Sequence, residues 1–362
     1  MRVAVRGAVI AGVMTAVLAG GLLWLRAENV VSQGRGLHAY APAFRGAAHG
    51  PEALMNAHDG QAFGSLALDP LLAHSAQWSD GPAGMAYRAA RPLLGWLVML
   101  TSWGSASAAA WSLVAWTAIG IGVMAAGAYL LAAAWRREAE WAPLLIFLPA
   151  VLGLIIYPGL SDGLATGLAL IGLALWTSGA GNHRDRAAVA CFCLAALSKE
   201  TTLFVPLALV LAAPRARRSL RLVAPFGVYA AWVGVVWLRL GALPTASDQG
   251  HIVLPFTGLA AAVPHWSWVQ VVCATSLVAL AGIAFWRAPS RDVRLLVVIS
   301  ALFAITLSEA VWRSWDFARI LLPVTVVGAC LLGRPSAAQD EDTAQASAPD
   351  GRSRQGEVTP AL

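Results

Sequence analysis

The chain has 362 residues, of which 58% are hydrophobic and only 12% are charged, and its mean hydropathy is +0.66. A soluble domain is about 25% charged with apolar residues near half, so no water-soluble fold can bury this much apolar surface. Lysine and arginine total 25 against 19 for aspartate and glutamate. These positive residues fall in short connections between apolar segments, where they set membrane orientation, which argues against a nucleic-acid partner.

The first apolar segment runs from about Arg6 to Leu25 and follows basic residues, as the apolar stretch of a signal peptide would. It is longer than a typical signal-peptide core, and no A-x-A cleavage site follows it. These features predict an uncleaved anchor with a cytoplasmic amino terminus. A polar stretch from Arg26 to about Arg91 comes next, in which we expect short interfacial helices.

Further apolar segments follow at approximately 92–103, 108–134, 141–158, 161–178, 187–199, 201–213, 220–240, 268–286, 293–312 and 318–333. Runs of about 20 apolar residues cross a hydrocarbon core of roughly 30 Å as helices. Lipid supplies no hydrogen bonds and the runs lack the alternation of a barrel, so the predicted fold class is an all-α integral membrane protein. Residues 335–362 are rich in Ser, Ala, Gln and Asp, which predicts a disordered cytoplasmic tail after a membrane domain of residues 1–334.

Arginines occupy alternate connections between these segments, and such connections are cytoplasmic in membrane proteins. They lie at Arg136 and Arg137, between His183 and Arg186, between Arg215 and Arg221, and between Arg287 and Arg294. The alternation holds if Pro92–Trp103, which is short at about 1.5 Å per residue, is an interfacial or re-entrant helix. The sequence then predicts about ten transmembrane helices, both termini in the cytoplasm, and residues 26–91 as a long first extracytoplasmic loop.

Residues 187–213 contain a polar interruption, Ser198-Lys199-Glu200-Thr201-Thr202, in the middle of an apolar stretch. One helix over this range would be about 40 Å long, and a turn at the interruption leaves two arms of about 20 Å, each short of a full crossing. Charges below the membrane surface are tolerated in a protein-lined, wet cavity. We therefore expect a recessed vestibule at Lys199 and Glu200.

With this topology a set of carboxylates gathers on the extracytoplasmic side. They are Glu28, Glu52, Asp59, Asp69, Asp80, Asp162, Glu200, Asp248, Glu309 and Asp316. Asp59 before a glycine is typical of an Asx turn, but it is also placed to act as a general base at the mouth of the cavity. Asp69 before a proline is typical of a helix end. Asp162 opens a helix, where an N-cap or first-turn acid is the alternative to a functional role.

Lys199 is the only lysine of the chain, and a Lys199–Glu200 pair at membrane depth is costly, so it indicates either a functional site or a structural ion pair. Arg319 lies in an aromatic stretch, where it either snorkels to the membrane surface or holds a phosphate by bidentate hydrogen bonds. The four cysteines lie in apolar segments and have no ligand-like spacing to histidine. His251 and His265 make a weak metal motif, and we predict no metal site.

Several motifs resemble a little-characterised bacterial branch of the GT-C superfamily, which comprises integral membrane glycosyltransferases that use polyprenyl-phosphate sugars outside the cytoplasm. The motifs are His58-Asp59-Gly60-Gln61-Ala62-Phe63, Ala67-Leu68-Asp69-Pro70, Arg91-Pro92-Leu93-Leu94-Gly95-Trp96, Ser161-Asp162 and Leu197-Ser198-Lys199-Glu200-Thr201. The likeness covers about residues 1–334. His58 stands where the branch usually has tyrosine, and Ala62 where an aromatic residue is common.

The resemblance implies transfer of a sugar from a polyprenyl-phosphate donor to a glycan or lipid acceptor of the envelope. By resemblance Asp59 is the catalytic candidate, with Asp69 as a second. We assign the donor phosphate to Lys199, Arg319 and Arg91. Further residues expected to orient these cations or contact substrate are Glu200, Asp162, His58 and Gln61. The mechanism requires no cofactor and no divalent metal. Two other interpretations remain open, a transporter or lipid flippase with a charged cavity, and a non-catalytic partner in envelope assembly.

Overall fold

The computed structural model describes residues 2–29, 42–44, 47, 49–54, 59–74, 82–156, 159–179, 181–213, 217–245, 250–314 and 316–335. The regular structure of these ranges is helical, and isolated bridges, among them Arg137 with Pro335 and Ile252 with Leu307, join some of the extended residues. The prediction of an all-α fold is confirmed. The predicted tail beyond residue 335 lies outside the described residues.

Four helices within the described ranges are long and apolar enough to cross a membrane. They cover Val3–Glu28, Ala106–Ala134, Arg218–Leu240 and Trp268–Trp286. Large apolar side chains on two of them face outward, including Leu25, which is 61% exposed, and Val278, which is 70% exposed. Such surfaces are stable against lipid rather than water. These helices support the prediction of a membrane protein.

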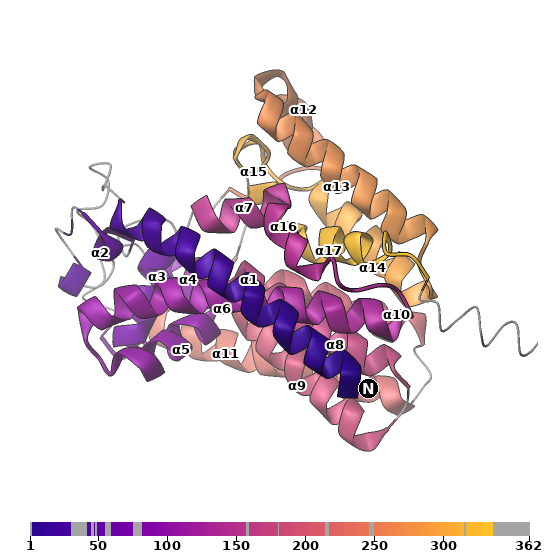
Figure 1. Ribbon diagram of the computed structural model, residues 1–362. Coiled ribbons are helices and arrows are strands. Elements are labelled where there is room, and N and C mark those ends of the chain that lie inside the picture. The colour runs from indigo at the N-terminus through magenta and orange to yellow at the C-terminus, as the bar shows by residue number, and fades with distance from the viewer. Residues whose placement is uncertain are drawn as a thin grey trace, which may run out of the picture.

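The centre of the molecule is α6 (Ala106–Ala134), which packs against both α1 (Arg2–Glu28) and α8 (Asp162–Thr177) (Figure 1). Small residues allow the close approach of α6 and α8. A Cβ atom on Gly167 would lie 2.5 Å from the backbone nitrogen of Met124. Gly163 and Gly167 lie four residues apart, a spacing that in a membrane helix predicts close packing. That packing is present, and it holds the first turn of α8 against α6.

Short helices follow α1 and gather at the end of the molecule opposite the amino terminus (Figure 1). They are η2 (Pro42–Phe44), α2 (Pro51–Leu54), α3 (Gly60–Leu68), α4 (Pro82–Ala89) and α5 (Pro92–Ser102). Pro92 suits the first turn of α5 because that position needs no backbone donor. With 11 residues α5 reaches only about 16 Å, too short to cross a membrane, as the sequence predicts.

The predicted turn within residues 187–213 is present. The helix α9 (Asn182–Ser198) ends at Lys199, whose backbone is extended, and η5 (Glu200–Leu203) leads into α10 (Phe204–Ala212). Beyond α10 lie η6 (Arg217–Val223) and α11 (Ala224–Leu240). Arg218 of η6 bonds Asp185 in the first turn of α9, so the chain has turned back along α9.

Three segments expected to span as single helices are each divided. They form η4 (Ala142–Phe147) and α7 (Pro149–Ile156), α14 (Arg291–Ala304) and α15 (Glu309–Arg313), and α16 (Asp316–Ile320) and α17 (Leu322–Cys330). Pro149 holds Leu148 extended and separates the first two. At the second break Ser308 donates its backbone N–H to the carbonyl of His251 over 2.9 Å, which draws the chain out of the helix.

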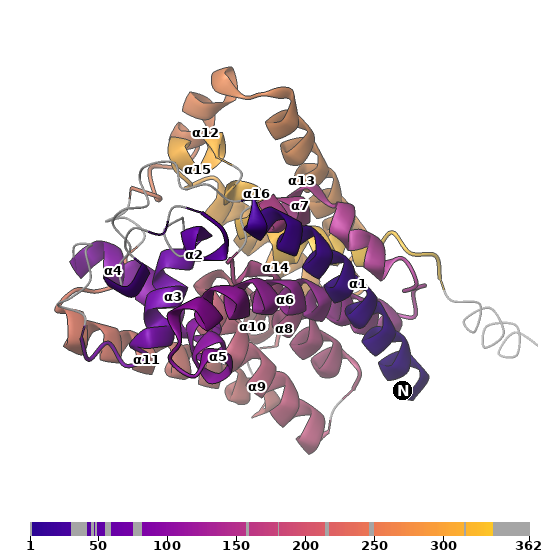
Figure 2. The ribbon, with the colours of Figure 1, turned by 60° about the vertical axis from the view of Figure 1, so that its left-hand side comes forward.

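The carboxy-terminal helices gather on one side of α6 and α8, and α17 contacts both of them (Figure 2). Before α14 come α12 (Thr257–Ala262), η7 (Val263–His265) and α13 (Trp268–Trp286). The ring of Phe317 in α16 is fully buried against Trp266 and Trp312. This packing fixes α16, and with it Arg319, above the start of α8.

Candidate functional site

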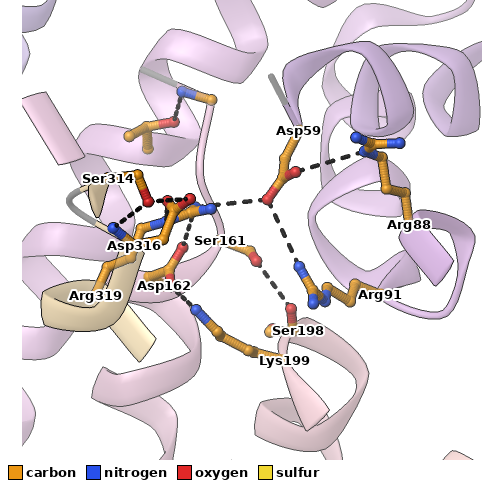
Figure 3. Close-up of polar contacts among 12 residues, drawn as sticks. Asp59, Arg88, Arg91, Ser161, Asp162, Ser198, Lys199, Ser314, Asp316 and Arg319 are labelled. Atoms are coloured by element: carbon orange, nitrogen blue, oxygen red, sulfur yellow. Dashed lines mark hydrogen bonds and ion pairs between the residues drawn. The ribbon is translucent and has the colours of Figure 1, made fainter. Parts of the chain in front are cut away.

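Asp59 occupies the N-cap position of α3, but its side chain accepts no capping hydrogen bond. The carboxylate instead faces three arginines (Figure 3). Its Oδ2 atom lies 3.5 Å from Nη1 of Arg319 and 3.6 Å from Nη1 of Arg91, and its Oδ1 atom lies 3.8 Å from Nε of Arg88. The next residue, Gly60, has no room for a side chain, because a Cβ atom there would lie 2.7 Å from the carbonyl oxygen of Leu54.

Asp162, the first residue of α8, joins two cations. Its Oδ1 contacts Nζ of Lys199, and its Oδ2 lies 3.4 Å from Nη1 of Arg319. The side chains of Asp162 and Lys199 are only 3% and 6% exposed. Ser161 donates from Oγ to the carbonyl of Ser198 over 2.9 Å, and this bond ties the start of α8 to the end of α9. That tie places Asp162 beside Lys199.

Arg91 and Glu200 form a bidentate ion pair. The Nε and Nη2 atoms of Arg91 donate to the two carboxylate oxygens of Glu200 over 2.7 Å each. Nη2 also donates to the hydroxyl of Tyr87 over 2.7 Å, and the guanidinium lies 4.7 Å from the centre of the Tyr87 ring. The fork of Arg91 is thereby fixed, with Nη1 directed at Asp59.

Arg319 bonds a third carboxylate, since its Nε donates to Oδ1 of Asp316 over 2.6 Å. Asp316 is oriented in turn by Ser314, whose hydroxyl donates to Oδ2 over 2.9 Å. The side chain of Asp316 is 40% exposed and that of Arg319 is 19% exposed. Exposure of the side chains thus falls from Asp316 through Arg319 to Lys199.

We call these eight side chains the ionic network. Its members are Asp59, Arg88, Arg91, Asp162, Lys199, Glu200, Asp316 and Arg319. Four are carboxylates and four are cations, so the network is neutral. They come from segments far apart in the sequence, and Figure 3 shows seven of them together, while Glu200 joins them through Arg91.

Burial alone would raise the pKa of the Asp59 carboxyl. The charges of Arg319, Arg91, Arg88 and Lys199 outweigh that effect and hold the pKa well below its usual range. Asp59 is therefore an ionised carboxylate at neutral pH. A carboxylate so strongly stabilised is a weak proton acceptor until some of the neighbouring positive charge is drawn away from it.

The structure brings together six of the residues that the sequence singles out for the site, namely Asp59, Arg91, Asp162, Lys199, Glu200 and Arg319. Arg88 and Asp316 complete the network, and the sequence assigns them no role in it. Arg88 lies in the polar stretch from 26 to 91, where a charge is ordinary, and the sequence groups Asp316 only with the other extracytoplasmic carboxylates, so neither is singled out. The recessed vestibule predicted at Lys199 and Glu200 stays a prediction.

Asp69, the second catalytic candidate, does not join the network. It is the C-cap of α3, and its two carboxylate oxygens accept the backbone N–H groups of Ala73 and His74 over 2.7 and 2.8 Å. This arrangement orders the turn after the helix, which is the alternative that its place before a proline favours. Gln61 lies half-buried on α3. His58 lies outside the described residues.

His251 borders the network and is not predicted from the sequence. Its ring packs 5.5 Å from that of Tyr87, and its buried Nδ1 atom has no hydrogen-bond partner within the described part of the chain. Burial lowers the pKa of His251, Asp316 opposes this, and Arg91 lowers it further. His251 is thus neutral at pH 7. The long-range bridge of Ile252 with Leu307 brings it here, and local sequence does not reveal such a bridge.

Among the residues that the structure describes, no group of three histidine, cysteine, aspartate or glutamate side chains is arranged to hold a metal ion. Comparisons with family models, with curated proteins and with solved structures found no match to this chain. The resemblance to the GT-C superfamily therefore stays a prediction drawn from the motifs.

Proposed function

We propose that the protein is a membrane glycosyltransferase of the GT-C type, which moves a sugar from a polyprenyl-phosphate donor to a glycan or lipid acceptor. The observation that supports this most is the convergence of Asp59, Lys199 and Arg319, where Arg319 lies within 3.5 Å of both Asp59 and Asp162. A carboxylate beside several fixed cations is the combination that this transfer needs.

The cations are the groups that would hold the donor phosphate. As the bond from the anomeric carbon to the phosphate oxygen breaks, the leaving polyprenyl phosphate gains negative charge, and fixed positive charges stabilise that transition state. Lys199, Arg319 and Arg91 are already oriented by Asp162 and Glu200. Because every cation has a carboxylate partner, the phosphate would take the place of a carboxylate at one or more of them.

Asp59 would act as the general base. It takes the proton of the acceptor hydroxyl while the acceptor oxygen bonds to the anomeric carbon and the phosphate leaves with the bonding electrons. With no enzyme-linked sugar, the anomeric configuration inverts. A phosphate bound to Arg319 and Arg91 draws positive charge from Asp59, which raises the pKa of Asp59 towards its ordinary range and makes it a stronger base. Donor binding would thereby prepare the base.

The proposal includes about ten transmembrane segments, cytoplasmic termini and the network on the extracytoplasmic side of a multi-pass protein in the cell membrane. The distribution of charge along α9 supports this orientation. Asp185, near its start, lies among arginines, whereas Lys199, just after its end, lies in the neutral network. Surplus arginine marks the cytoplasmic side of a membrane protein.

A sugar-transfer assay tests the proposal. The purified protein is supplied with labelled polyprenyl-phosphate sugars and a panel of envelope acceptors, and the labelled product is measured. We expect transfer by the wild type and a loss of about 10²- to 10⁴-fold in Asp59→Asn, because general base catalysis contributes on that order. Asp69→Asn is the matched control, since it makes the same change on the same helix, and it should retain transfer.

If folded Asp59→Asn protein transfers sugar at the wild-type rate, Asp59 is not the general base. Movement of the intact donor across proteoliposomes without transfer would favour the transporter or lipid flippase instead. A protein that neither transfers nor moves the donor would be better explained as a non-catalytic assembly partner.

A further inference from the structure

A groove of about 440 Å³ lies near the amino-terminal end of α9, away from the ionic network. Arg186, Val189 and Ala190 of α9 line one wall, and Arg221 and Ala224 line the other. We call it the arginine groove. It lies at the basic end of Arg218–Leu240, one of the segments long and apolar enough to cross a membrane.

The nearby carboxylate of Asp185 is already neutralised by Arg218. The Nη2 atom of Arg218 lies 2.6 Å from Oδ1 of Asp185 and donates to the carbonyl of Trp176 over 2.8 Å. The guanidinium also lies 3.8 Å from the centre of the Trp176 ring. Arg218 is thus held in place by its own partners and is not available to a ligand.

The two arginines that line the groove are differently placed. Arg221 has one longer contact, 3.4 Å from Nη1 to Oδ2 of Asp185, and its side chain is 44% exposed. Arg186 is exposed and forms no ion pair with a carboxylate of the described ranges. With Asp185 balanced by Arg218, the groove carries surplus positive charge at its rim.

The rest of the groove is apolar. Val189, Ala190 and Ala224 line it, and Leu220 and Val223, which flank Arg221 in the sequence, are 69% and 56% exposed. Free phosphate would use the arginines and leave this apolar wall in water. A lipid anion would use both, with its phosphate at the arginines and an acyl chain along the wall.

We propose that the arginine groove binds an anionic membrane phospholipid. Arg186 and Arg221 hold its phosphate by the planar hydrogen-bonding geometry of guanidinium groups, and an acyl chain packs against Val189, Ala190 and Ala224. This site is separate from the ionic network and does not depend on the proposed transfer reaction.

Retention of lipid by the purified full-length chain tests this site. The protein is reconstituted in nanodiscs of phosphatidylglycerol and phosphatidylcholine and extracted into detergent, and the bound lipid is counted by native mass spectrometry. We expect retained phosphatidylglycerol to fall roughly tenfold in Arg186→Gln/Arg221→Gln, from the attraction between basic side chains and anionic lipid. Arg291→Gln/Arg294→Gln is the control, because it removes the same charge from another exposed arginine pair.

A second variant, Ala190→Trp, fills the groove and leaves both arginines in place, so it should also reduce retention. Thermal unfolding of each variant shows whether it is folded. The proposal would be overturned if Arg291→Gln/Arg294→Gln lost as much phosphatidylglycerol as Arg186→Gln/Arg221→Gln, or if both groove variants retained as much as the wild type. It would also be overturned if the wild type retained phosphatidylcholine as well as phosphatidylglycerol. If millimolar inorganic phosphate displaced the lipid, the acyl chain would contribute nothing to binding, and the groove would be a site for free anions instead.

Discussion

A charged cluster lies at each end of α9, and the two are built differently. Near the amino-terminal end the buried Asp185 lies among arginines, of which Arg218 and Arg221 contact it. Just after the carboxy-terminal end, Lys199 belongs to a network with equal numbers of carboxylates and cations. The two ends are about 25 Å apart at 1.5 Å per residue, so neither cluster compensates the other.

The difference fits the roles proposed for the two clusters. Arginines around Asp185 are partly exposed, so they reach water or lipid headgroups when a partner is lost. Lys199 and Asp162 are almost fully buried, so each depends on the other for its charge to be tolerated. A balanced network that is buried at Asp162 and Lys199 and more exposed at Asp316 fits the exchange of anions proposed for it. The partly exposed arginines around Asp185 fit the orientation and lipid contact proposed for that end.

Removal of one carboxylate at each end is the strongest test of this contrast. Asp162→Asn leaves Lys199 and Arg319 with an unbalanced buried charge, and we expect a loss of about 3–5 kcal/mol in the free energy of unfolding. Asp185→Asn should cost less, on the order of 1 kcal/mol, because the arginines that lose a partner, Arg218 and Arg221, are 27% and 44% exposed and remain partly solvated where they lie. Unfolding in mixed detergent micelles, followed by circular dichroism, measures both.

The double variant Asp162→Asn/Lys199→Met is the control for this comparison. It removes both partners of the buried pair and should recover much of the stability lost in Asp162→Asn. If Asp162→Asn and Asp185→Asn are equally destabilising, the supposed contrast between a dependent buried pair and an adaptable surface cluster is wrong.

The next test concerns how rigidly the network end is held. Gly167→Ala forces a methyl group against the backbone of Met124, and such overpacking costs about 1–3 kcal/mol. Because the start of α8 carries Asp162, the same change should lower the rate of sugar transfer. Gly234→Ala in α11 is the control, as no atom lies within 4 Å of its Cβ position, and it should be neutral or slightly stabilising. Equal thermal midpoints for the two variants would contradict a tight α6–α8 contact.

The sequence predicts those residues of the site whose free-energy cost in a membrane is evident from their immediate sequence neighbours. A single lysine beside a glutamate inside an apolar stretch is costly in a membrane, so Lys199 and Glu200 are conspicuous, and the helix does break there. Asp162 is conspicuous because an acid opens an apolar helix. The glycine spacing after it predicts close helix packing, and the structure identifies α6 as the partner.

Features that depend on long-range pairing were not accessible from the sequence. Arg88 contacts Asp59, and Asp316 contacts Arg319 of its own helix, but the two pairs join one network only because Arg319 also reaches Asp59 from the other end of the sequence. The break after α14 arises from a bridge between Ile252 and Leu307, and the same bridge brings His251 to the network. No local pattern marks a two-residue bridge formed across more than fifty positions.

The smallest effect expected is on the pH dependence of stability, which tests whether the network holds Asp59 as an anion. The pKa of Asp59 is lowered in the folded protein relative to about 4 in the unfolded chain. Its contribution to stability is therefore complete above pH 4 and is lost as the pH falls below 4, towards the folded-state pKa. The difference in unfolding free energy between wild type and Asp59→Asn should be constant from pH 8 to pH 5.

Kinetics of the proposed sugar transfer give the same test, because the pH dependence of kcat/KM reports the pKa values of groups in the free protein. A fall in kcat/KM between pH 7 and pH 5 would not be due to protonation of Asp59, whose pKa is well below this range. If the fall is due to protonation of His251, it should disappear in His251→Gln. A different result would be that the fall in kcat/KM persists in His251→Gln while the difference in unfolding free energy between wild type and Asp59→Asn also decreases from pH 7 to pH 5. That result would mean that Asp59 titrates near neutrality. The four surrounding cations would then fail to control it, and the contrast between the two ends of α9 would lose its basis.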